Sequence, residues 1–131
     1  MSDKEEHIRY WEATAKDDLE AIDYLFNGKK YVQALFFAHL SLEKILKAHF
    51  IKDNEENVPP KTHNLIYLYN KTLLNLNEDD TDFLQVMNTF QLEGRYTDYL
   101  SYLHRSTLKE DASNTIQQTK TLFKCLQEKL Q

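Results

Sequence analysis

The chain has 131 residues, of which 41% are hydrophobic and 28% charged, a balance typical of one folded domain rather than of a disordered segment. A formal net charge of -5 repels a polyanion, so we expect no binding of duplex DNA through neutralisation of its phosphates. The charged N-terminus and the lack of an apolar run of roughly 20 residues predict a cytoplasmic protein with no membrane span.

The first half of the chain predicts two long helices, because glycine and proline, which break helices, each occur only twice in the chain. Apolar residues step by three and four from Asp3 to Phe26, with Ser2 or Asp3 as the N-cap. We expect Gly28 to supply the left-handed residue that ends this helix. A second helix is expected from Lys30 to Lys52.

The second predicted helix is unusually apolar around its circumference. One face is regular, but four large side chains extend beyond that face: Phe36, Phe37, Leu40 and Phe50. A helix of this kind must be covered on more than one side. We therefore expect the rest of the bundle and a second copy of the chain to cover it, as in a homodimer.

The second half predicts shorter helices and one more long helix. The expected elements are a polar loop (Asp53–Lys61), a short helix with Thr62 as N-cap, a fourth helix (Asp80 to Leu92, with Thr81 or an aspartate near its start), a loop after Gly94 (Arg95–Thr107) and a last helix (Leu108 to Leu130). The predicted fold is an all-α, up-and-down four-helix bundle with an additional short helix, forming one domain over residues 1–131.

Four motifs in a fixed order resemble those of the HEPN domain, the "higher eukaryotes and prokaryotes nucleotide-binding" family. They are Trp11 with Asp18-Leu19, Gly28-x-x-Tyr31 leading into ALFFAHLSLEKILKA, Pro60-x-Thr62-His63-x-Leu65, and Glu93-Gly94-Arg95-Tyr96-x-Asp98. The resemblance implies a small helical bundle that usually homodimerises and is often encoded beside a minimal nucleotidyltransferase. Some members are ribonuclease toxins, and others are non-catalytic nucleotide-binding or scaffolding modules.

Active HEPN nucleases carry an arginine followed, after four to six intervening residues, by a histidine. This pair suits metal-independent RNA cleavage, since arginine stabilises phosphate charge and histidine transfers a proton. The required positions after Arg95 hold Leu100, Ser101 and Tyr102, and those after the other two arginines hold no histidine either. His104 lies eight intervening residues beyond Arg95, outside the pattern.

Three other residues could bind an anion or have only a structural role. Lys44 and Lys47 share a helical face, which could be an anion-binding rim or a solvated stripe. Glu43 and Lys47 also form an i, i+4 ion pair worth about 0.2–0.5 kcal/mol. His63, expected in the first turn of a helix, could face an anion or bond a neighbouring carbonyl.

The arginine motif allows the same two interpretations. Arg95 could bind a phosphate while Tyr96 stacks on a base. Alternatively, Arg95 could pair with Asp98 or Glu93 and hold its loop against the bundle.

The remaining polar residues give little sign of a cofactor. His39 and Glu43 lie one helical turn apart, but no H-E-x-x-H pattern and no glycine-rich phosphate loop occur, so we expect neither a metal nor a cofactor. The resemblance favours a non-catalytic module that binds nucleotide, RNA or a nucleotidyltransferase in a toxin–antitoxin-like system. The alternatives are a ribonuclease toxin using Arg95 and His104, and a purely structural interaction protein.

Overall fold

The computed structural model of the chain describes residues 2–90 and 109–131. Its elements are α1 (Asp3–Asn27), α2 (Tyr31–Asp53), α3 (Leu65–Asn70), α4 (Glu78–Met87), the 3-10 turn η1 (Asn88–Phe90) and α6 (Lys109–Glu128). No strand occurs in these two ranges. The predicted all-α class is confirmed, and each long helix lies within two residues of its predicted limits.

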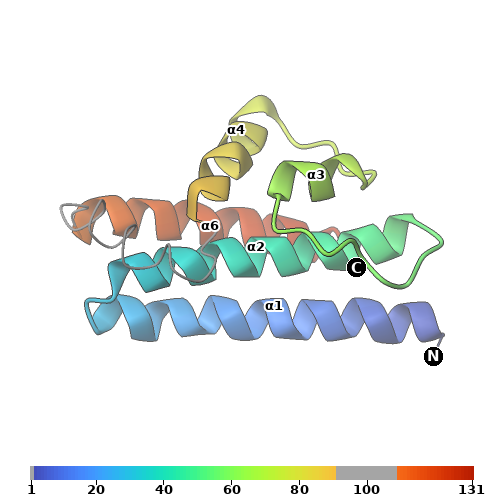
Figure 1. The fold of residues 1–131 in the computed structure, drawn as a ribbon, viewed down its shortest axis with the longest axis horizontal. Coiled ribbons are helices and arrows are strands. Elements are labelled where there is room, and N and C mark those ends of the chain that lie inside the picture. Colours follow the sequence, from blue (N-terminus) through green and yellow to red (C-terminus); the bar gives the residue numbers. More distant parts are fainter. Residues whose placement is uncertain (1, 91–108) are drawn as a thin grey trace.

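The three long helices lie side by side, with the two short helices to one side (Figure 1). Helices α2 and α6 run in the same direction and α1 runs in the opposite one, while α3 and α4 pack on the side of α2 that faces away from α1. Together α3 and α4 occupy the third position of an up-and-down bundle. None of the described helices is long and apolar enough to cross a bilayer.

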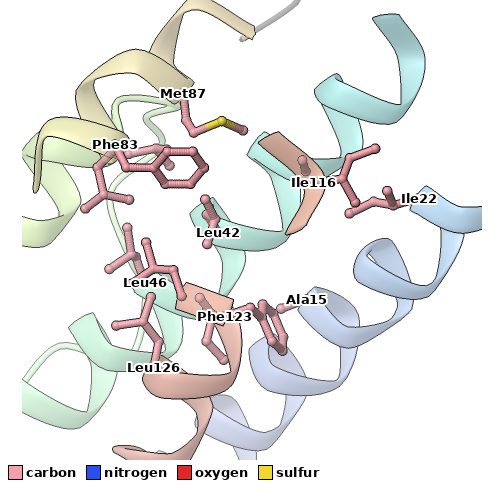
Figure 2. Packing of buried hydrophobic residues seen from close by; sticks show 14 of the residues in the cluster. Ala15, Ile22, Leu42, Leu46, Phe83, Met87, Ile116, Phe123 and Leu126 are labelled. Atoms are coloured by element: carbon pink, nitrogen blue, oxygen red, sulfur yellow. The ribbon is translucent and has the colours of Figure 1, made fainter. Parts of the chain in front are cut away.

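Helix α2 forms the centre of the core, as its apolar circumference predicts. It packs against α1, α3, η1 and α6, and Figure 2 shows Leu42 and Leu46 among side chains of α1, α4 and α6. Of the side chains beyond its regular face, Phe50 is buried inside the protomer, whereas Phe36, Phe37 and Leu40 are half-buried. The bundle itself therefore covers much of the helix, and the homodimer stays a prediction.

The predicted start of the first short helix is wrong, whereas that of the second lies within two residues of the observed start. Asn64, rather than Thr62, caps α3, because its side-chain oxygen accepts hydrogen bonds from the backbone N–H groups of Ile66 at 3.0 Å and Tyr67 at 3.1 Å. Asn77 caps α4 in the same way, and the expected aspartates lie near the start of this helix, at Asp79 and Asp80. Asparagine caps at least as well as threonine, and in both helices it lies where its short amide reaches the first turn.

The turn between α1 and α2 also differs from the prediction at one residue. Gly28 has a φ of -82°, and the left-handed residue is Lys29, with a φ of 64°. The N–H of Lys29 bonds the carbonyl of Phe26 at 3.0 Å, and the N–H of Lys30 bonds that of Leu25 at 2.8 Å. This pair of bonds is the Schellman motif, whose left-handed position falls one residue later than the glycine.

Replacing Lys29 by glycine should therefore stabilise the domain by about 1 kcal/mol, because glycine adopts a positive φ without the steric cost that a Cβ carries. Urea denaturation of the Lys29→Gly variant measures the change. Lys30→Gly is the matched control, since Lys30 has a negative φ of -96° and gains nothing from glycine. A Lys29→Gly variant no more stable than Lys30→Gly would contradict the assignment.

Candidate functional site

A buried ion pair lies on the middle of α2. The Nζ of Lys47 is 2.9 Å from Oε2 of Glu43, one helical turn earlier. Glu43 is only 3% exposed and Lys47 only 7%. The predicted pairing of these two residues is confirmed, but the predicted solvated stripe is wrong, because the surrounding bundle removes both charges from water.

The segment before α3 adds a histidine to this ion pair. The Nδ1 of His63 is 2.9 Å from Oε1 of Glu43, so the ring donates its Nδ1 hydrogen to the carboxylate. His63 precedes the cap residue Asn64, and the expectation that it lies in the first turn of the helix is therefore wrong. Its side chain is 46% exposed, which makes it the part of the group most open to solvent.

A second histidine lies beside the same carboxylate. The Nε2 of His39 is 2.8 Å from the backbone carbonyl of His63, so Nε2 carries the hydrogen. Its Nδ1 lies 3.8 Å from Oε1 of Glu43 and has no hydrogen-bond partner among the described residues. Burial lowers the pKa of His39, and the charge of Glu43 opposes this only in part. His39 is therefore neutral at pH 7.

Side chains of helix α1 contact both lysines that the sequence singles out, Lys47 and Lys44. The Nζ of Lys47 lies 5.4 Å from the centre of the Trp11 ring, within the range of a cation–π contact. The Nζ of Lys44 forms an ion pair with Oδ2 of Asp18 at 2.7 Å. A phosphate bound by Lys44 or Lys47 would therefore have to compete with the carboxylate of Asp18 or of Glu43.

Comparison with known families identifies the chain. The model of the HEPN domain matches residues 8–130. The chain belongs to the HEPN family, as its motifs indicate. Comparisons with curated proteins and with solved structures gave no match. HEPN domains are a nucleotide-binding and ribonuclease type of family.

Three of the four motifs of this HEPN domain meet in one place. Trp11 and Asp18 come from the first motif, Glu43 with both lysines from the second, and His63 from the third. We call the group of His39, Glu43, Lys47 and His63 the Glu43 cluster. Its hydrogen bonds and ion pair join α2 to the segment before α3, so these motif residues have a structural role that their order along the chain does not reveal.

Sequence reasoning treated Glu43 as the partner of Lys47 and as a neighbour of His39, and it missed the central position of Glu43. A signal was present, because a carboxylate in the middle of an apolar helix must find several partners. The predicted site residues Arg95, Tyr96, Asp98 and His104 lie outside the described residues. In the part that the structure describes, no group of three or more His, Cys, Asp or Glu side chains is placed to hold a metal ion.

Proposed function

We propose that this HEPN domain is a non-catalytic module that binds a nucleotide or RNA and acts as a cytoplasmic homodimer with a minimal nucleotidyltransferase, in a toxin–antitoxin-like system. The observation that carries the proposal is the internal pairing of the motif residues. Lys47 pairs with Glu43, and Lys44 pairs with Asp18. Charges already matched inside the bundle stabilise the fold rather than a transition state.

The arginine motif then provides the ligand contacts in this proposal. Arg95 binds a phosphate through its planar guanidinium group, and Tyr96 stacks on a base. Asp98 orients Arg95. His63, which is half-exposed and fixed by Glu43, provides a further polar contact. The absence of a histidine at the required spacing after each of the three arginines supports binding without cleavage.

One observation favours a ribonuclease as the alternative. A carboxylate that holds the Nδ1 hydrogen of a histidine is the arrangement that orients a general base in many hydrolases. The 2.9 Å contact between Glu43 and His63 has this geometry. In this alternative, Arg95 stabilises the phosphate charge, and His63 or His104 transfers the proton.

Thermal unfolding with nucleoside triphosphates tests the binding proposal. A ligand at about one hundred times its Kd should raise the free energy of unfolding by about 2.7 kcal/mol and so raise the Tm. Arg95→Ala should abolish the rise. Arg9→Ala is the matched control, because Arg9 is exposed on α1 and lies outside the arginine motif. If neither nucleotides nor RNA raise the Tm, the binding proposal is wrong and a purely structural role remains.

Incubation of RNA with the wild type separates the two functions. The binding module leaves the RNA intact at every pH. A ribonuclease would cleave it without added metal, lose activity in Arg95→Ala, and lose its general base in either His63→Gln or His104→Gln.

A further inference from the structure

A second polar site lies away from the Glu43 cluster, where α2 and α6 both end. A pocket of about 320 Å³ opens there, lined by the last turn of α2, by residues 73–75 and by Lys129 beyond the end of α6. The pocket walls come from three separate parts of the chain. No residue of the Glu43 cluster is among the described residues that line it.

A completely buried histidine belongs to the wall of this pocket. His49 has no exposed surface, and its Nε2 lies 2.8 Å from the backbone carbonyl of Leu126 on α6. A carbonyl only accepts hydrogen bonds, so Nε2 carries the hydrogen and Nδ1 of the neutral ring is an acceptor. That Nδ1 has no hydrogen-bond partner among the described residues. Buried acceptors are nearly always satisfied by a donor, which here can come from a bound ligand or an ordered water.

The charged groups of the wall indicate the charge of the molecule that would bind there. Lys52 and Lys129 are both exposed cations. The carboxylate in the wall, Asp53, accepts a hydrogen bond from the backbone N–H of Leu73 at 2.8 Å, and its other oxygen lies 3.9 Å from the Nζ of Lys52. Among the described residues, the wall therefore has two cations and one carboxylate, and that carboxylate is already bonded within the protein.

We propose that this pocket binds a protonated phosphate, either inorganic phosphate or a singly protonated phosphate monoester. The P–O–H group donates its hydrogen to Nδ1 of His49, and the anionic oxygens face Lys52 and Lys129. Because Nδ1 is buried, this hydrogen bond requires the wall to shift so that the ligand reaches the ring. Sulfate matches phosphate in size but has no hydrogen to donate at neutral pH, so the site discriminates between the two anions. The proposal is independent of the binding assigned to Arg95.

NMR titration of the ¹⁵N-labelled protein tests the proposal near pH 6, where about half of a phosphate monoester keeps its proton. Inorganic phosphate should move the Nδ1 resonance of His49 and the amide resonances of residues 73–75, whereas sulfate at equal ionic strength should not. Glycerol 2-phosphate as a second probe shows whether the pocket also admits the monoester. Lys129→Gln should weaken phosphate binding about threefold to fivefold, the effect of one surface charge pair.

Lys124→Gln is the matched control, because Lys124 is an exposed lysine of α6 that does not line the pocket. It should leave the affinity unchanged. His49→Gln keeps a donor for the Leu126 carbonyl and should remove the preference for phosphate over sulfate. Equal responses to phosphate and sulfate would mean an adventitious ion only, and no response at millimolar phosphate would mean that a water molecule satisfies Nδ1. Either result overturns the proposal.

Discussion

Replacing Glu43 by alanine should lower the free energy of unfolding by about 3–5 kcal/mol. The substitution leaves the ammonium group of Lys47 buried without a counter-charge, and it removes the acceptor of the His63 Nδ1 hydrogen. A domain of this size has a total stability of about 5–15 kcal/mol, so the variant should be close to unfolding. Urea denaturation followed by circular dichroism measures the loss.

Two variants distinguish a buried charge from a general weakening of the fold. Lys44→Ala removes the more exposed ion pair with Asp18 and should cost only about 1 kcal/mol. The double variant Glu43→Leu, Lys47→Met removes both charges together and should recover most of the loss, because apolar residues of similar volume replace the pair. If Glu43→Ala costs no more than Lys44→Ala, the cluster does not have the stabilising role assigned here.

The stability of the domain should fall steeply as the pH drops below about 6.5. Burial lowers the pKa of His39 and of His49 from the ordinary value of 6.5. Between the lowered pKa and 6.5, the unfolded chain binds protons that the folded protein excludes. The free energy of unfolding therefore decreases as the pH falls. Each histidine contributes up to about 1.4 kcal/mol per pH unit, and the two together contribute up to about 2.7.

Urea denaturation at a series of pH values checks this slope. The stability contributed by the neutral rings is fully present above pH 6.5 and declines below it, until the pH passes the lowered pKa of each histidine. His49→Gln should reduce the slope by up to about half, while His7→Gln, at an exposed position on α1, should leave it unchanged. Identical slopes in wild type and His49→Gln would show that His49 is not buried in its neutral form.

The helices of this HEPN domain could be predicted because their signals are local. Ser2 caps α1, accepting a hydrogen bond from the N–H of Glu5 at 3.2 Å, and the apolar spacing of α1, α2 and α6 is visible in a window of a few turns. The predictions failed where two similar signals compete within a few residues. Asn64 and Thr62 are both capping residues, and the chain entering α3 decides between them.

The candidate site was only partly predictable, because some of its contacts are local along the chain and others are not. Lys44, Lys47 and His63 could be selected as polar residues in or beside apolar segments, and the pairing of Lys47 with Glu43 one helical turn away could be predicted. The partners of Lys44 and His63 could not. The partner of Lys44 is Asp18 on another helix, and that of His63 is Glu43, 20 residues earlier. Pairing over such distances depends on how helices pack, which a periodicity does not encode.

The sequence by itself determined the all-helical class, the positions of the long helices and, through its motifs, the HEPN family. Only the tertiary structure decided that Glu43 and Lys47 are buried, that His63 donates to Glu43, and that His49 bonds Leu126, 77 residues away. Helix formation depends on neighbours within one or two turns, so it can be read along the chain. Burial and long-range pairing depend on which faces meet when the bundle closes, because packing removes water from some charged groups and not from others.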